Sequence, residues 1–226
     1  MKIIKSFKIL KKEINFNQNI GFIPTMGSLH KGHLSLINIA QKKTRKVLVS
    51  IYVNPSQFNE KKDFDKYPRN LSKDISMLKK LKVDYLFLPS NGEIYKKGIN
   101  KKFKIFKKDI IMCAKYRKGH FQGVLAVVNR FLQNIKSKYI FLGEKDFQQI
   151  HLIKRYLINK FNTKIYICKT IRNKNNFPMS SRNKNLTKSL LKNSEQISNL
   201  LFNFKKKIMK NFDNVKLLEY YQNRIN

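Results

Sequence analysis

Cysteine is nearly missing from this sequence, and long apolar runs are missing altogether. The two cysteines, Cys113 and Cys168, are too few for a disulfide framework and lack the spacing of metal ligands. No run of about eighteen apolar residues is present, which argues against a membrane-spanning helix. Lysines interrupt residues 1–8, so this segment lacks the apolar core of a signal peptide. We therefore expect a cytoplasmic protein that has no membrane partner.

Acidic residues are also scarce. The chain has 13 Asp and Glu against 49 Lys and Arg, a formal net charge of +36. Such a field attracts nucleic acids. However, the lysines are spread over the whole length together with abundant Asn, Ile, Phe and Tyr, a pattern typical of a strongly A+T-biased genome, and no nucleic-acid-binding motif accompanies them. We do not expect a nucleic-acid partner, and salt-dependent binding of RNA or DNA would contradict this expectation.

The apolar residues, 42% of a 226-residue chain, can bury a sizeable core. Residues 20–23 predict a buried strand that ends at Pro24, because proline cannot continue a central ladder. A helical pattern begins at Ser28, and a β-branched strand follows at 47–53. This order predicts a parallel sheet, in which ligands bind beyond the carboxyl ends of the strands.

The connection between the first buried strand and its helix carries the strongest functional signal. Gly27 and Gly32 allow the backbone to approach a ligand closely. His30 and His33, three residues apart on the first helical turn, point the same way, and a helix N-terminus favours phosphate. A surface pair or a chance metal pair is the alternative, but the other two histidines are distant in sequence. The segment predicts a nucleoside triphosphate site.

Several polar blocks follow one another in a fixed order along the chain. They are Pro24-Thr25-Met26-Gly27 with His30-Lys31-Gly32-His33, Val53-Asn54-Pro55-Ser56-Gln57-Phe58, Tyr67-Pro68-Arg69, Gly119-His120-Phe121, Gly143-Glu144-Lys145-Asp146-Phe147-Gln148-Gln149 and Met179-Ser180-Ser181-Arg182-Asn183. Over about residues 1–204 the chain thereby resembles the His-x-Gly-His nucleotidyltransferase superfamily and, within it, the pantothenate synthetase family.

The resemblance implies an α/β fold, with a Rossmann-like parallel sheet covered by helices on both faces in residues 1–172. Residues 173–226 would form a small, shortened and mainly helical C-terminal lid domain. The implied activity is an ATP-dependent, AMP-forming ligation of (R)-pantoate to β-alanine through pantoyl adenylate, with release of pyrophosphate. ATP would arrive as Mg-ATP, with no tightly bound cofactor and no metal site formed by the protein itself. The resemblance also implies a homodimer.

The same resemblance implies roles for individual residues. Stabilisation of phosphoryl charge is assigned to His30, His33, Lys145, Ser180, Ser181 and Arg182. ATP binding is assigned to Met26, Gly27, Ser28, Leu29, His30, Lys31, Gly32, His33, Asn54, Gly143, Glu144, Lys145, Asp146, Ile171, Met179, Ser180, Ser181 and Arg182. Pantoate binding is assigned to Met26, Gln57 and Gln149. Judged from its position alone, Asp146 could equally cap the helix that follows it.

Periodicity predicts the remaining elements. These are a strand and a helix within 1–19, a helix over 70–81, a strand at 83–88, a loop at 91–95, a solvated lysine-rich stretch over 96–108, a helix over 124–135, a strand at 139–143 with a helix to about 159, a strand at 163–168 and helical spacing from 186 onward.

Three features depart from the family pattern. Asn175-Asn176-Phe177-Pro178 stands where Asp-Gly-Leu-Ala is usual, and the added proline is expected to stiffen or reroute that loop. Gln122 stands where Arg is usual. The small C-terminal sheet of the family has no counterpart in the sequence, which leaves closure of the lid open.

Two other functions stay open. A different nucleotidyltransferase on the same scaffold, moving AMP or CMP to a phosphorylated acceptor, would share the histidine pair but would not need Gln57 and Gln149 in these contexts. A basic nucleic-acid-binding relic of the fold would suit the charge, but it gives no reason to retain the polar blocks.

Overall fold

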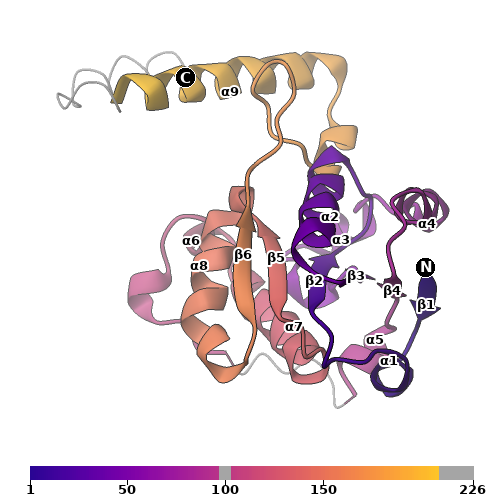
Figure 1. The fold of residues 1–226 in the computed structure, drawn as a ribbon. Helices are drawn as coiled ribbons and strands as arrows, with labels where there is room; N and C mark the ends of the chain where they lie inside the picture. The colour runs from indigo at the N-terminus through magenta and orange to yellow at the C-terminus, as the bar shows by residue number, and fades with distance from the viewer. Residues whose placement is uncertain (97–102, 209–226) are drawn as a thin grey trace. The chain divides into compact units, whose positions relative to one another are not determined.

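The structure, a computed structural model, describes residues 1–96 and 103–208, and its strands form one parallel sheet (Figure 1). Across the sheet the strands run in the order β1 (Lys2–Ile4), β4 (Tyr85–Phe87), β3 (Lys46–Ile51), β2 (Ile20–Thr25), β5 (Tyr139–Gly143) and β6 (Lys164–Cys168). Every neighbouring pair is parallel. The predicted Rossmann-like sheet is therefore confirmed.

Helices connect the strands. They are α1 (Phe7–Glu13), α2 (Lys31–Lys43), α3 (Lys61–Asp65), α4 (Leu71–Lys80), α5 (Asn91–Ile94), α6 (Cys113–Tyr116), α7 (His120–Asn134), α8 (Phe147–Tyr156) and α9 (Lys188–Ile208). Short 3-10 helices are η1 (Pro55–Gln57), η2 (Lys107–Asp109), η3 (Glu144–Asp146), η4 (Ile158–Lys160) and η5 (Ser181–Asn185). Among the described residues, no helix is long and apolar enough to cross a membrane.

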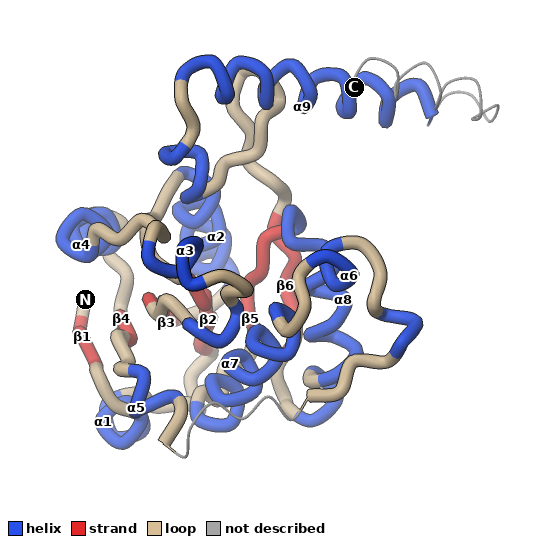
Figure 2. The backbone as a smooth tube through the Cα atoms, turned by 180° about the vertical axis from the view of Figure 1, so that it is seen from behind, coloured by secondary structure: helices blue, strands red, loops and turns tan. Residues whose placement is uncertain are grey.

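Alternate residues of each central strand enter two separate apolar clusters, one on each face of the sheet. On β2, Phe22 belongs to the cluster that contains residues of α1, α7 and α8, whereas Ile23 belongs to the cluster that contains residues of α2 and α4. Leu48 and Val49 divide in the same way on β3. Figures 1 and 2, which view the sheet from opposite sides, show α2 and α7 covering different faces. Helices on both faces are thus confirmed.

The chain order reverses between β2 and β5. From β2 the chain adds β3 and then β4 on one side, and later adds β5 and β6 on the other. A ligand crevice forms where the strand order reverses, beyond the carboxyl ends of the two strands. Here those ends lead into residues 26–33 and residues 144–149, which belong to two of the polar blocks in the sequence. The topology therefore brings two distant motifs to one edge.

The prediction that the first buried strand ends at Pro24 is wrong, because β2 runs on to Thr25. Pairing with β3 continues through Pro24 and Thr25, whereas pairing with β5 is recorded only at Gly21 and Phe22. Successive residues of a parallel strand direct their N–H groups to opposite neighbours. Because the carbonyl of Thr25 bonds toward β3, Pro24 faces β5, where the ladder has already ended. The missing donor therefore costs no ladder bond.

Two other boundaries also differ from the prediction. The predicted loop at 91–95 contains the one-turn helix α5, which Ser90 caps by accepting a hydrogen bond from the N–H of Glu93. Helix α7 begins at His120 rather than at 124, directly after Gly119, whose left-handed φ of 79° suits glycine. The lysine-rich stretch over 96–108 and the helical spacing beyond 208 lie partly outside the described residues.

The chain divides into two compact units, Met1–Lys169 and Thr170–Asn226. In the second unit, the segment that departs from the family pattern is tied to α9. Glu195 accepts hydrogen bonds from the side chains of Asn173 and Asn175, and Asn176 donates to Asn199. A bridge between Arg172 and Pro178 closes this loop. Side-chain amides therefore hold the loop where the usual glycine is absent.

Candidate active site

The loop between β2 and α2 is held from outside by a buried carboxylate. Asp74 on α4, with 2% of its surface exposed, accepts a hydrogen bond from the backbone N–H of Ser28 and another from that of Leu29, each at 2.8 Å. Gly27 and Ser28 both have left-handed φ angles, 76° and 49°. A Cβ atom on Gly27 would lie 2.9 Å from Asp74 Oδ2, so glycine is required there on two counts.

His30 caps helix α2. Its Nδ1 accepts a hydrogen bond of 3.1 Å from the N–H of Gly32, and α2 begins at the next residue, Lys31. A neutral imidazole that accepts at Nδ1 carries its proton at Nε2, where it can act as a donor. The N–H groups of Gly27 and Gly32, like those that Asp74 binds, are therefore engaged within the protein. Because these four N–H groups already have partners in the protein, we expect a ligand at this loop to be bound mainly by side chains.

His33 lies beside His30, as the spacing predicted, with ring centroids 4.1 Å apart. Burial is the main cause that lowers the pKa of His33 to about 3, and the neighbouring side chains of His30 and Lys145 lower it further. Its Nδ1 is buried and has no hydrogen-bond partner. At neutral pH this imidazole is therefore uncharged, and Lys145, which follows β5, lies near enough to influence it. The two blocks on either side of the chain reversal thus lie near each other.

A second cluster follows β3. Gln57 donates a hydrogen bond of 3.0 Å from Nε2 to the Sδ of Met26 and accepts one of 3.1 Å at Oε1 from Asn54. Thioether sulfur is a weak acceptor, so a ligand oxygen can take over this donor at little cost. The structure thus places the side chains of Met26 and Gln57, two predicted pantoate contacts, against each other.

Asn54, predicted to bind the nucleotide, is 1% exposed, and both the oxygen and the nitrogen of its side-chain amide form hydrogen bonds within the protein. Its Oδ1 accepts hydrogen bonds from the hydroxyls of Ser56 and Tyr95, and its Nδ2 also donates to the carbonyl oxygen of Gly123. Burial raises the pKa of Tyr95, so its hydroxyl keeps the proton that it donates. In this structure Asn54 organises the loop after β3 through these bonds.

The block after β5 places its two glutamines differently. Gln148 is buried and donates to the carbonyls of Asp109 and Ile111, whereas Gln149, the predicted pantoate contact, is half-buried. Asp146 stands at the N-cap of α8 but makes no side-chain capping bond, and its carboxylate lies 4.0 Å from Lys145. The capping interpretation of Asp146 therefore has no hydrogen bond to support it.

The remaining predicted residues belong to the second unit. Ser180 caps η5 by accepting a hydrogen bond from the N–H of Arg182, and Ser181 is buried. The N–H of Met179 donates to the carbonyl of Ile171. Within this unit the five predicted residues therefore lie on one short hairpin and the turn that follows it.

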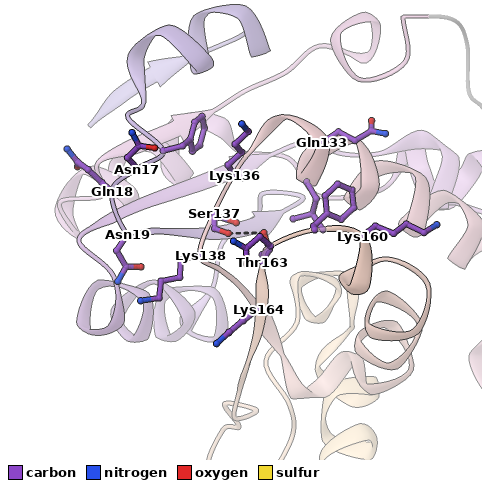
Figure 3. A pocket seen from close by; sticks show the side chains of 14 residues that line it. Asn17, Gln18, Asn19, Gln133, Lys136, Ser137, Lys138, Lys160, Thr163 and Lys164 are labelled. Carbon is purple, nitrogen blue, oxygen red and sulfur yellow. Dashed lines mark hydrogen bonds between the residues drawn. The ribbon is translucent and has the colours of Figure 1, made fainter.

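No group of three or more His, Cys, Asp or Glu side chains suited to a metal ion occurs among residues 1–96 and 103–208. A cavity of about 860 Å³ lies at the opposite, amino-terminal edge of the sheet (Figure 3). Its lining includes Asn19, Lys138 and Lys164, at the starts of β2, β5 and β6. It holds none of the predicted site residues, and its four lysines are all exposed to solvent.

Sequence reasoning missed three residues that support the site, namely Asp74, Tyr95 and Arg117. Arg117 Nη1 and the Nε2 of His120 are 3.0 Å apart, and the Nδ1 of His120 is 2.6 Å from the backbone carbonyl of Gln57. The one sequence signal for Asp74 was its place on the apolar face of α4, one turn before Leu78.

Comparison with known proteins gives a consistent result. A family model described as pantoate-beta-alanine ligase matches residues 2–226. Pantothenate synthetase of Francisella tularensis subsp. mediasiatica is 42% identical over 228 residues, which cover 99% of this chain and 83% of that protein. Pantothenate synthetase of subsp. novicida is 44% identical over 203 residues, covering 88% of this chain and 77% of that protein.

Two solved structures share the fold. The pantoate-beta-alanine ligase from Francisella tularensis, complexed with beta-gamma ATP and beta-alanine, matches with a TM-score of 0.87 and 40% identity, over 100% of this chain and 85% of that one. The pantothenate synthetase from Thermus thermophilus matches with a TM-score of 0.92 and 28% identity, over 100% and 83% of the two chains.

Proposed function

The chain belongs to the pantoate-beta-alanine ligase family, and we infer from this that it joins pantoate to β-alanine while ATP is split to AMP and pyrophosphate. The carboxylate of pantoate attacks the α-phosphorus of ATP, which forms pantoyl adenylate and releases pyrophosphate. The amine of β-alanine then attacks the acyl carbon, loses a proton and displaces AMP. Neither step needs a covalent bond to the protein, so catalysis rests on positioning and on stabilising phosphoryl charge.

The phosphate groups of ATP are proposed to bind His30, His33 and Lys145. The observation that carries this assignment is the buried, unpartnered Nδ1 of His33, which lies beside His30 and close to the charge of Lys145. A neutral imidazole can donate one hydrogen bond to a phosphoryl oxygen, and an ammonium group adds a point charge. The rest of the proposed nucleotide contacts in the first unit are Met26, Gly27, Ser28, Leu29, Lys31, Gly32, Asn54, Gly143, Glu144 and Asp146.

Pantoate is proposed to bind Met26, Gln57 and Gln149. Met26 follows β2, Gln57 follows β3 and Gln149 follows β5, three strands that are neighbours in the sheet. The Nε2 group of Gln57, which donates to the sulfur of Met26 in this structure, can donate instead to a hydroxyl or carboxylate oxygen of the acid. Neutral amides suit this task because they bind the acid without forming an ion pair that would lower its nucleophilicity.

Residues 173–226 are proposed to act as a lid domain beside a nucleotide- and pantoate-binding domain of residues 1–172. Ser180, Ser181 and Arg182 would contact the triphosphate, with Ile171 and Met179 at the nucleotide. Arginine suits this task because its guanidinium is permanently charged and forms paired hydrogen bonds to phosphate oxygens. A lid would also protect the acyl adenylate from hydrolysis.

Three further assignments complete the proposal. Mg²⁺ is proposed to enter bound to the phosphates of ATP, so that it forms part of the substrate. The chain is proposed to act in the cytoplasm and to form a homodimer. Exposed apolar side chains at Ile110, Ile111, Met112 and Phe147 offer a surface for self-association, and light scattering of the purified protein measures its mass.

The deciding experiment is AMP release from ATP and Mg²⁺ with (R)-pantoate and β-alanine as the two acceptors. We expect release that requires both acceptors, together with ATP–pyrophosphate exchange that requires pantoate alone. Exchange supported by a different acid or by a phosphorylated acceptor would instead favour another nucleotidyltransferase. Binding of RNA in place of either reaction would favour the nucleic-acid-binding alternative.

A further inference from the structure

The first turn of α7 packs directly on the 3-10 helix η1 that carries Gln57. Gly123 faces Ser56 so closely that a Cβ atom on it would lie 2.2 Å from the Ser56 carbonyl oxygen. The carbonyl of Gly123 in turn accepts a hydrogen bond of 3.1 Å from Asn54. The start of α7 is therefore fitted to the backbone of η1 and does more than cover the sheet.

His120, the first residue of α7, adds a hydrogen bond to this contact. It is 7% exposed, and its Nδ1 lies 2.6 Å from the carbonyl oxygen of Gln57. Its Nε2 lies 3.0 Å from Nη1 of Arg117. A guanidinium can only donate and a carbonyl can only accept, so Nε2 is the acceptor and Nδ1 carries the proton. The hydrogen bonds thus run in one direction, from Arg117 through His120 to Gln57.

The side chain of Gln57 depends on this backbone contact. Its amide spans Met26 and Asn54, with Nε2 on a weak sulfur acceptor, so its own hydrogen bonds constrain it only loosely. A fixed carbonyl restricts rotation of the Gln57 peptide and thereby fixes the direction in which the side chain leaves η1. The amide is held ready to bind an oxygen of the acid substrate.

We propose that Arg117 and His120 are positioning residues that orient Gln57 for the acid substrate through its backbone carbonyl. The proposal rests on the proposed function, because it assumes that Gln57 binds pantoate. It assigns neither residue to the nucleotide. Loss of the His120 hydrogen bond should therefore weaken the use of pantoate and leave the use of ATP unchanged.

The test compares His120→Ala with His120→Asn, because the amide nitrogen of Asn occupies nearly the position of Nδ1 and can donate to the same carbonyl. In the AMP-release assay we expect His120→Ala to raise the KM for pantoate about five- to tenfold, with the KM for ATP within about twofold of wild type. His120→Asn should restore the KM for pantoate to within about threefold. Gln133→Ala, an exposed position at the far end of α7, is the matched control.

Arg117 provides a second pair if His120→Ala does not fold. Arg117→Met removes the donor to Nε2 and should raise the KM for pantoate, whereas Arg117→Lys keeps a donor and should restore it. Equal increases in both KM values, or no rescue by Asn and Lys, would overturn the proposal. An inactive wild type would refute the proposed function instead, so the two failures are distinguishable.

Discussion

The carboxylate of Asp74 on α4 accepts a hydrogen bond from the backbone N–H of Ser28, 46 positions earlier in the chain. The same carboxylate accepts from Leu29, so one buried side chain satisfies two consecutive amides of a strained turn. The histidine pair lies directly after this turn. Asp74 therefore fixes the backbone from which His30 and His33 project.

Replacing Asp74 should damage both stability and nucleotide use. Asp74→Ala leaves two buried amides unpaired, which costs about 2–5 kcal/mol, and should raise the KM for ATP at least about tenfold. Asp74→Asn keeps one acceptor oxygen and should fall between this variant and wild type. Urea unfolding and the AMP-release assay measure the two effects. Asp65→Asn, at an exposed acid on α3, should match wild type, and an Asp74→Ala enzyme with normal stability would contradict this account.

Removing the half-buried imidazole of His33 should abolish the first chemical step while preserving the fold. His33→Ala takes away the imidazole whose Nδ1 is unpartnered beside His30 and Lys145, so pantoate-dependent ATP–pyrophosphate exchange should fall by about 10²–10³-fold. Circular dichroism should show native helix content. His151→Ala, at an exposed histidine on α8, is the control and should retain its exchange rate. Full exchange activity in His33→Ala would show that His33 does not bind the phosphate groups of ATP as proposed.

The low pKa of His33 also predicts a pH dependence of stability. Burial, with a further contribution from the neighbouring His30 and Lys145, lowers this pKa to about 3 in the folded protein, against about 6.5 in an unfolded chain. Between these values the unfolded chain takes up a proton that the folded protein excludes, so stability falls as pH drops below 6.5. At pH 5 the loss from His33 is about 2 kcal/mol, and His33→Gln should not show it. Parallel stability losses from pH 7 to pH 5 in the two proteins would rule out this pKa.

Much of the fold could be predicted from the sequence because it depends on short-range patterns. The strands at β5 and β6 and the helix α4 follow from apolar spacing within single segments. Pro24 was misjudged for the opposite reason. Whether its missing N–H matters depends on how far β5 runs alongside β2, which is a property of two segments separated by more than a hundred residues.

The candidate site divides in the same way. The closeness of His30 and His33 was predicted from their spacing, although His30 lies at the N-cap of α2 and only His33 lies on its first turn. The hydrogen bonds of Asp74 and His120 join residues far apart in sequence. In each case the partner is a backbone group, which every residue type has, so the sequence does not indicate the bond. A lone acid on the apolar face of a helix was the sole available sign of Asp74.

The tight contact between α7 and η1 makes Gly123 a sensitive position. In Gly123→Ala the new methyl would lie 2.2 Å from a backbone oxygen, so helix and loop must separate. We expect destabilisation of about 2–4 kcal/mol and a raised KM for pantoate, because the separation displaces Gln57. Thermal unfolding and steady-state kinetics measure these effects. Gly92→Ala, whose methyl would meet only the Ser90 side chain at 3.9 Å, is the matched control and should be neutral. A Gly123→Ala protein as stable as this control would disprove the contact.

Gly143, at the end of β5, allows the proposed nucleotide position to be tested without disturbing the fold. A Cβ atom there would meet nothing within 4 Å, and the φ of −80° suits any residue. Gly143→Ala should therefore unfold at the wild-type temperature. If ATP lies over the carboxyl end of β5, the methyl intrudes on the ligand, and the KM for ATP should rise about tenfold while that for β-alanine stays constant. An unchanged KM for ATP would place the nucleotide away from Gly143, because in the folded protein the added methyl has no other group to contact.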